Sequence, residues 1–351
     1  MAIIASDNQK TPGRPSGPGR EEGGLMDQAV KSHLEGIKFG EMQRHRNVAV
    51  FPVFSAVDGS PNYLTMKEAM AGGFLAVTEV SAGGAVPELK VINSASVAVL
   101  ILDGEELAGA KQNRIVNTTI LLRRQSETII PVSCTEQGRW SYTSAHFDDS
   151  GHIATHRVRG VTKQSVSDSL KAGRQFHSDQ GAVWANVSSV LEDCSVASPT
   201  GAMKDAFESR AKDIDEYLGK FACLPGQKGL LVLIDGKVAG MDMVSLESAY
   251  AALHPKLVKS YAMEALASRG ADGQIVPDGA PQAFIAAALA CTGKRFKSVG
   301  HGWDFRLEGR GLVGSALVYN KALIHAAFFR TTEAERAGNM SGFSRRRGFR
   351  G

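Results

Sequence analysis

A block of polar residues interrupts an apolar stretch of the sequence. The block, Lys111, Gln112, Asn113 and Arg114, lies between apolar residues 100–102 and 115–116. If the block continues a strand, successive side chains point to opposite faces, so neither face stays apolar. Polar groups on a half-buried strand need water, protein partners or a ligand. The block therefore predicts one wall of a ligand-binding site.

Further polar side chains close to this block complete the candidate chemistry. Three carboxylates are candidate general bases that would activate water, namely Glu105, Glu106 and Glu136. Lysine and arginine side chains can bind phosphate or carboxylate oxygens, and glutamine and asparagine side chains can hydrogen-bond to an amide or to the edge of a base. The tryptophan indole can stack on a ligand ring. The ligand-binding candidates here are Lys111, Gln112, Asn113, Arg114, Arg139 and Trp140. The alternative is a solvated hairpin whose acids and bases pair across strands.

Residues 300–306 are a third candidate segment. Aromatic side chains alternate there with polar ones, so that a strand would carry one aromatic and one ionic face. We expect His301, Asp304 and Arg306 to join the ligand-binding residues. A plain ion pair between Asp304 and Arg306 is the alternative.

Cys134 is a possible nucleophile if its thiolate is stabilised. However, Glu136 falls on the same strand face and would raise the thiol pKa, and no histidine is near in the sequence. We therefore favour a buried structural thiol.

A cluster of metal-type side chains follows at residues 146–156. A helix would bring two of the histidines onto one face, but Gly151 and two β-branched residues disfavour it, so we expect a solvated loop and no metal site. The cluster consists of His146, Asp148, Asp149, His152 and His156. No glycine-rich phosphate loop with a flanking strand and helix occurs, and the cofactor remains unknown.

Composition narrows the class of protein. The 351 residues are 43% hydrophobic, enough to bury a sizeable core. The net charge is +4, and residues 342–351 alone hold four arginines, so the body of the chain is near neutral and is not a nucleic-acid surface. Four scattered cysteines without a CxxC pair argue against disulfides and zinc. No window reaches the roughly 18 apolar residues of a membrane span, so we expect a cytoplasmic protein.

The sequence patterns of the segments that must position these residues predict an α+β fold with antiparallel β-rich halves and intervening helices. Residues 1–26 are expected to be a disordered arm and 336–351 a basic Arg/Gly tail. RNA contact through this tail is one hypothesis, and a flexible solvated end is the favoured alternative. Between them lies one α+β domain at 27–335. It has a β-rich part at about 45–145, a helical segment at about 160–222 and a β/α part at about 228–330.

Two Asp-Gly pairs, at 103–104 and 235–236, predict β-hairpins, since this dipeptide supports the positive φ of a type I′ turn. The flanking sequences resemble each other, which is compatible with an internal duplication or with chance.

The strings LDGEELAGAKQNR at 102–114 and CTEQGRW at 134–140 also support a family assignment. With them, the chain from about 48 to 329 resembles the ARG (ADP-ribosylglycohydrolase) and rhodanese-phosphatase-superfamily-associated protein domain family. This resemblance implies ADP-ribose- or NAD-type metabolism and no particular reaction.

We therefore expect binding or hydrolytic processing of an ADP-ribose- or NAD-related phosphorylated nucleotide. Whether the protein is an enzyme stays open, since a non-enzymatic protein-interaction protein could use the same polar surface. The expected partners are a small phosphorylated ligand or another protein, and no membrane.

Overall fold

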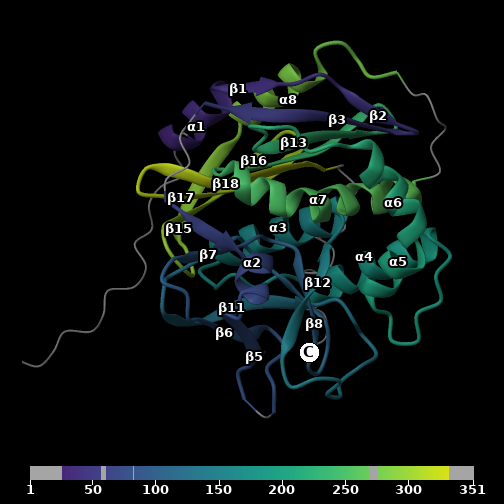
Figure 1. Cartoon of the computed structure of the whole chain (residues 1–351). Coiled ribbons are helices and arrows are strands. Elements are labelled where there is room, and N and C mark those ends of the chain that lie inside the picture. Colours follow the sequence, from purple (N-terminus) through teal and green to yellow (C-terminus); the bar gives the residue numbers. More distant parts are fainter. Residues whose placement is uncertain (1–25, 57–60, 82, 269–274, 332–351) are drawn as a thin grey trace, which may run out of the picture.

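The computed structural model describes residues 26–56, 61–81, 83–268 and 275–331 (Figure 1). The predicted basic tail and all but the last residue of the predicted N-terminal arm lie outside these residues. The described chain is strand-rich, with helices and antiparallel sheets combined in a mixed α+β fold, as predicted.

A large antiparallel sheet forms one half of the described structure. Its strands bury apolar side chains on both faces, because helices cover both sides. Along the sheet, the order is β1 (Ile37–Phe39), β3 (Val48–Ser55), β13 (Gly229–Ile234), β14 (Lys237–Val244), β18 (Ala322–Arg330), β17 (Leu312–Tyr319), β16 (Trp303–Gly309) and β15 (Thr292–Lys297), with β2 (Gln43–His45) also paired to β3.

A small closed barrel forms the other half. Its interior is filled by aliphatic side chains such as Val77, Leu89 and Leu107, all fully buried. Around the barrel, the order is β11 (Ser126–Cys134), β6 (Glu88–Asn93), β5 (Leu75–Glu79), β12 (Phe147–Ile153), β8 (Glu105–Gly109) and β9 (Arg114–Val116), which returns to β11. A three-stranded sheet beside it contains β10 (Ile120–Leu122), β7 (Ala98–Ile101) and β4 (Tyr63–Thr65).

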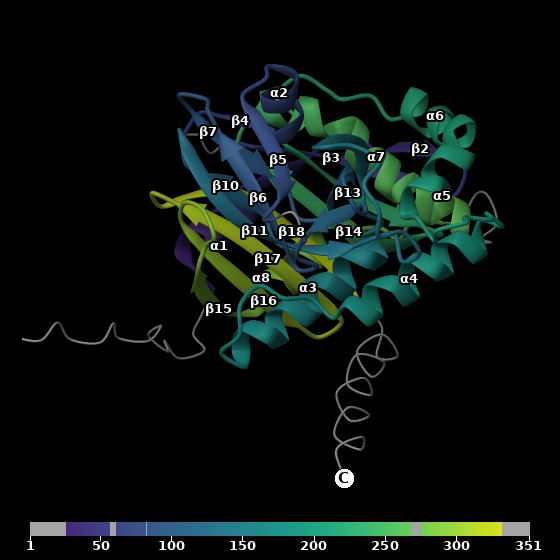
Figure 2. The same cartoon turned by 90° about the horizontal axis from the view of Figure 1, so that it is seen from below.

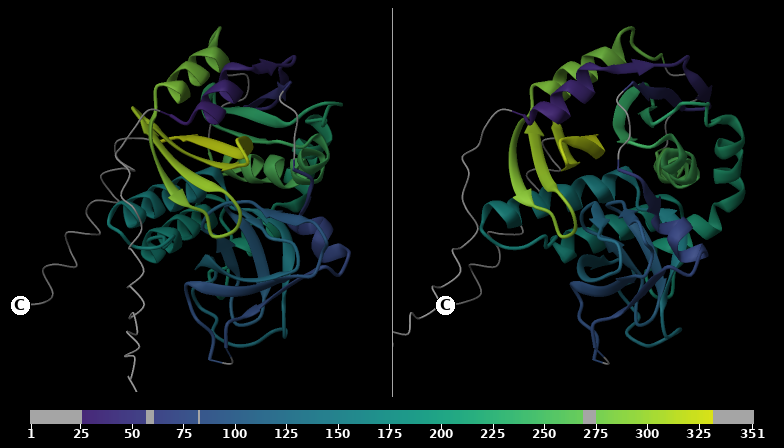
Figure 3. Two further views of the ribbon diagram at one scale, coloured as in Figure 1. Left: turned by 90° about the vertical axis from the view of Figure 1, so that its left-hand side faces the viewer. Right: turned by 60° about the vertical axis from the view of Figure 1, so that its left-hand side comes forward.

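Helices cover both faces of the large sheet. Helices α1 (Gln28–Glu35) and α8 (Ala280–Leu289) pack on its outer face, while α3 (His156–Lys171) and α7 (Glu247–Ala267) lie between the sheet and the barrel (Figures 1 and 3). Figure 2 shows α4 (Gln180–Asp193), α5 (Met203–Ser209) and α6 (Ala211–Lys220) following one another along one side. The short α2 (Met66–Ala71) packs against β4, β5 and β12.

Buried ion pairs connect the two halves through α3. Arg159 donates two hydrogen bonds, of 3.0 and 2.6 Å, to Asp242 on β14 and one of 3.3 Å to Asp103 in the turn before β8. Lys163, one turn further along α3, lies 2.9 Å from Asp103 and donates to Ser315 on β17. Because all these groups are buried away from water, each charged side chain is stabilised by its ion-pair and hydrogen-bond partners.

Several local features have causes that are visible in the sequence, and the hairpin predicted at the second Asp-Gly pair is confirmed. Thr65 caps α2 in a capping box with Glu68. The second Asp-Gly pair forms the β13–β14 hairpin, with positive φ at Asp235 and Gly236. The C-terminal strands β15 to β18 form a meander, and Asn320 has a positive φ in its last turn.

Two predictions around the first Asp-Gly pair are wrong. The pair does form a turn, but β7 pairs with β4 and β10 whereas β8 pairs with β9 and β12, so no hairpin results. The likeness between the two Asp-Gly sequences therefore does not extend to strand pairing. The polar block is not a strand either. Residues 110–113 form a turn, which Gly109 and Ala110 enter with positive φ. Of the block, only Arg114 belongs to a strand, β9.

Candidate functional site

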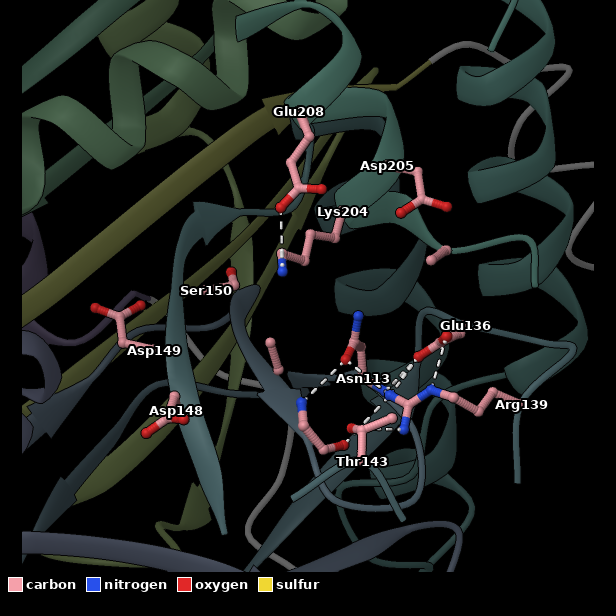
Figure 4. A pocket seen from close by; sticks show the side chains of 13 residues that line it. Asn113, Glu136, Arg139, Thr143, Asp148, Asp149, Ser150, Lys204, Asp205 and Glu208 are labelled. Atoms are coloured by element: carbon pink, nitrogen blue, oxygen red, sulfur yellow. Dashed lines mark hydrogen bonds and ion pairs between the residues drawn. The ribbon is translucent and has the colours of Figure 1, made fainter. Parts of the chain in front are cut away.

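A polar cleft of about 550 Å3 lies between the barrel and α5 (Figure 4). Helix α5 is held there because Met203 N–H donates to the Thr135 carbonyl, and Ala202 forms a β-bridge with Glu136. The lining comes from strands β8 and β12, from the turn before β9, from the loop after β11, and from α5 and the residue before it. It consists of Ala108, Gly109, Asn113, Glu136, Arg139, Thr143, Asp148, Asp149, Ser150, Ala202, Lys204, Asp205 and Glu208.

Glu136 and Arg139 form a rigid corner of the cleft. Arg139 donates to both carboxylate oxygens of Glu136, at 2.8 and 2.6 Å, and also to Asn113 Oδ1 and the Ala110 carbonyl. Thr200 and the Asn113 backbone donate to the same carboxylate. Burial disfavours the charged form of Glu136, but these hydrogen bonds outweigh it and hold its pKa below the usual value. Glu136 is therefore an ionised anchor at neutral pH.

Glu106 lies directly behind the cleft and has the opposite electrostatic character. Its carboxyl is fully buried, and Oε1 accepts a 2.8 Å hydrogen bond from Thr135. Oε2 is buried and makes no hydrogen bond of full geometry in the described part of the chain, although the Ser150 hydroxyl lies close enough to act on the carboxyl. Burial raises the pKa of Glu106 to about 7, and the hydroxyls of Thr135 and Ser150 and the charge of Lys204 offset it only in part. Glu106 thus exchanges its proton near neutral pH.

Glu106 should make the folded protein less stable as the pH rises from about 4.5 to about 7. The folded state keeps the proton up to a pKa of about 7, whereas the unfolded chain releases it near 4.5. Over this window the native state binds more protons, so the free energy of unfolding falls with rising pH, by roughly 3 kcal/mol in full.

The measurement compares urea unfolding of the wild type and Glu106→Gln between about pH 5 and 8. Two histidines, the buried His33 and the half-buried His152, have pKa values lowered to about 4 and act in the opposite sense below about pH 6.5, but they act equally in both proteins. We expect the variant to gain stability relative to the wild type as the pH rises. A difference that does not change with pH would contradict the raised pKa.

Carboxylates dominate the charge of the cleft. Lys204 pairs with Glu208 at 3.1 Å, and Arg139 is engaged by Glu136. Against these two bases stand five acids: Glu136, Asp148, Asp149, Asp205 and Glu208. The cleft therefore favours groups that donate hydrogen bonds over groups that carry negative charge.

Seven of the nine predicted ligand-binding residues do not line this cleft, and four of them lie in or near the polar block. Lys111, Arg114 and Trp140 form a separate group next to it: the Lys111 ammonium and the Arg114 guanidinium lie 5.2 and 5.5 Å from the centre of the Trp140 ring system. Gln112 accepts a 2.7 Å hydrogen bond from Arg114. Of the predicted wall, Asn113 and Arg139 alone line the cleft, together with Glu136.

Other predicted site residues lie further away. Glu105 pairs with Lys256 of α7 at 2.6 Å in a buried ion pair. Asp304 and Arg306 pair with each other and with Thr118 where the large sheet meets the segment after β9. His301 stacks on Tyr319. The structure thus does not bring residues 301–306 to the cleft.

The remaining candidates have structural surroundings. Cys134 is fully buried, and burial raises its pKa, which agrees with the structural thiol that we favoured. The expected loop at residues 146–156 is instead strand β12 and the start of α3. His152 there stacks on Phe207, and Asp149 pairs with Lys256. Among the described residues, no group of three or more histidine, cysteine, aspartate and glutamate side chains could hold a metal ion.

Sequence reasoning missed the contribution of α5. Lys204, Asp205 and Glu208 are ordinary charged residues in a helix and are separated from the cleft residues of the barrel by more than 50 positions. No sequence motif marks them. Asp148 and Asp149 were noted, but as possible metal ligands. Only the packing of α5 against residues 135 and 136 brings these groups together.

Fold and cleft together define a mixed α+β protein whose polar site lies between a small barrel and a helix. The chain belongs to the ARG and Rhodanese-Phosphatase-superfamily-associated Protein domain family, whose family model matches residues 36–329. No curated protein and no solved structure matches the chain significantly. No helix in the described ranges combines the length and apolar character needed to cross a membrane.

Proposed function

We propose that the protein binds a ribose-containing nucleotide of the ADP-ribose or NAD class in the cleft and hydrolyses its glycosidic bond. The observation that carries this proposal is Glu106, a buried carboxyl behind the cleft with one oxygen that makes no hydrogen bond of full geometry in the described part of the chain and with a pKa of about 7. A group with such a pKa can accept and return a proton at neutral pH. The family's association with ARG proteins supports the ligand class.

The charge of the cleft suggests which part of the nucleotide it takes. Carboxylates such as Asp148 and Asp205 accept hydrogen bonds from sugar hydroxyls, while they repel phosphate oxygens. The ribose therefore occupies the acidic part, and the phosphates lie toward Lys204, the more exposed of the two bases. Arg139 keeps its position through Glu136 and shapes the wall.

In the proposed reaction, a water molecule attacks the anomeric carbon of the ribose. The water oxygen bonds to this carbon, and the glycosidic bond breaks with its electron pair going to the leaving group. Glu106 takes the proton that the water loses and returns it to a leaving group that departs as an anion; nicotinamide leaves NAD as a neutral molecule, and in that case the proton passes to solvent, so the carboxylate is regenerated either way. The hydroxyl of Ser150, which lines the cleft and influences the pKa of Glu106, relays the proton.

The test uses the full chain, calorimetric titration and product analysis with ADP-ribose, NAD and ribose 5-phosphate. We expect binding of at least the first two and release of nicotinamide from NAD or of adenine from one of the two, because these are the groups held by their glycosidic bonds. Absence of both binding and product for all three compounds would reject the proposal.

A protein-interaction function is the second candidate. One observation favours it: Glu136 and Arg139 direct their hydrogen bonds to each other and to neighbouring protein groups, as in a structural corner. In addition, Phe74, Ile92 and Ile129 are exposed on or beside neighbouring barrel strands. A defined complex that is lost in Ile92→Asp, together with no response to the nucleotides, would support this alternative.

A further inference from the structure

Two buried, oppositely charged side chains at one end of the barrel each carry polar atoms that have no hydrogen-bond partner in the described part of the chain. Arg114 begins β9 and is fully buried, and Glu79 ends β5 with 8% of its surface exposed. Arg114 Nε and Nη2 and both carboxylate oxygens of Glu79 are without partners in the described structure. Burial lowers the pKa of Arg114, and Glu79 is among the charges that oppose this effect. The two groups are thus near each other without forming an ion pair.

The orientation of Arg114 leaves its binding edge unused. Nη1 donates to Gln112 Oε1 at 2.7 Å, which fixes the plane of the guanidinium group. The Nε and Nη2 atoms form the edge that donates two parallel hydrogen bonds to a carboxylate or carbonyl group. This edge and the Glu79 carboxylate together offer two donors and two acceptor oxygens to a group placed between them.

Surface side chains cover this pair. Trp140 and Tyr142 are 48% and 52% exposed, and Lys111 Nζ lies 5.2 and 5.1 Å from their ring centres. Lys111 also donates to the Gly83 carbonyl at 2.6 Å, which ties down the loop next to Glu79. The Trp140 ring also lies 5.5 Å from the Arg114 guanidinium, so a flat ligand ring that displaces Lys111 would meet an aromatic surface beside the Arg114 edge.

We propose that Arg114 and Glu79 form a binding site for an amide group carried on a flat ring, such as a pyridine carboxamide or a lactam nucleobase. The amide carbonyl accepts from the Arg114 edge, and the amide N–H donates to Glu79. A carboxylate would satisfy Arg114 but face the negative charge of Glu79, and an ammonium group would do the reverse. A neutral amide satisfies both, and Trp140 stacks on its ring. The site lies beside the turn at 110–113, outside the cleft lining, and does not depend on the proposed hydrolysis.

Calorimetric titration of the full chain tests this site with four probes: nicotinamide, uracil, nicotinate and pyridine. We expect nicotinamide or uracil to bind at least about tenfold more tightly than nicotinate or pyridine, since nicotinate and pyridine lack an amide group. Glu79→Gln should weaken amide binding and strengthen nicotinate binding, because the repulsive charge is removed. Trp140→Ala should weaken all ring ligands, and it keeps the core intact because Trp140 is half-exposed. Glu127→Gln, an exposed acid on β11, is the matched control and should bind like the wild type.

Three results would overturn the proposal. If the folded protein binds none of the probes, water alone bridges Arg114 and Glu79. If nicotinate binds as tightly as nicotinamide, the site is a simple anion site. If Glu79→Gln does not fold, the test rests on Trp140→Ala, and unchanged amide binding in that variant would overturn the site.

Discussion

Replacing Glu106 with glutamine is expected to lower turnover of the ribosyl substrate by about 10²–10⁴-fold, the usual contribution of a general acid or base. Glutamine has nearly the same volume and can keep the hydrogen bond from Thr135, but it cannot exchange a proton. Ligand affinity should change little, since Glu106 is buried behind the cleft. The measurement is kcat and KM with the best substrate of the nucleotide panel.

Two further variants sharpen this test. Glu127→Gln controls for the loss of an acid at an exposed position and should keep full activity. Thr135→Val removes a hydrogen bond that lowers the pKa of Glu106, so the acidic limb of the kcat/KM profile should move to higher pH. Full turnover by a folded Glu106→Gln variant would exclude Glu106 as the proton acceptor.

Replacing Arg159 with methionine is expected to lower the free energy of unfolding by about 3–5 kcal/mol. Methionine preserves much of the aliphatic volume but leaves the carboxylates of Asp242 and Asp103 buried without their main partner. Arg159 also lies over the Phe329 ring, with 4.7 Å from Cζ to the ring centre, so packing is lost as well. Chemical unfolding followed by circular dichroism measures the change.

An exposed arginine provides the matched control. Arg46 pairs with Glu216 at 2.5 Å, yet both side chains are largely exposed, so Arg46→Met should cost less than about 1 kcal/mol. Adding Asp242→Asn to Arg159→Met should recover part of the loss, because it removes one uncompensated charge. Equal effects of the Arg46 and Arg159 substitutions would show that the buried ion pairs do not stabilise the junction of sheet and barrel.

Local sequence patterns predicted many elements because their causes are local. The capping box at Thr65 depends on a side chain three residues away, and the turn at Asp235 depends on a backbone conformation that Asp-Gly tolerates. The same dipeptide at 103–104 also formed a turn. The strands on either side nevertheless diverge into two sheets, because each pairs with strands elsewhere in the chain.

The candidate site was predictable only in part for a similar reason. Unusual polarity marked Asn113, Glu136 and Arg139, and all three line the cleft. The polarity around Arg114 was equally visible, but the turn at 110–113 directs this residue to a different environment. Side chains alternate between the two faces of a strand, but not in a turn. The direction of each side chain in residues 110–113 could therefore not be derived from the sequence.

By itself, the sequence determined the α+β class, most individual strands and helices, the family and the polar segments in which a site lies. The tertiary structure decided that strands β5, β6, β8, β9, β11 and β12 close into a barrel, that α5 completes the cleft, and that Glu106 is buried behind it. The physical reason is the range of the interactions. Backbone sterics, caps and turns act over a few residues, whereas strand pairing and the burial that raises the pKa of Glu106 depend on residues far apart in the chain.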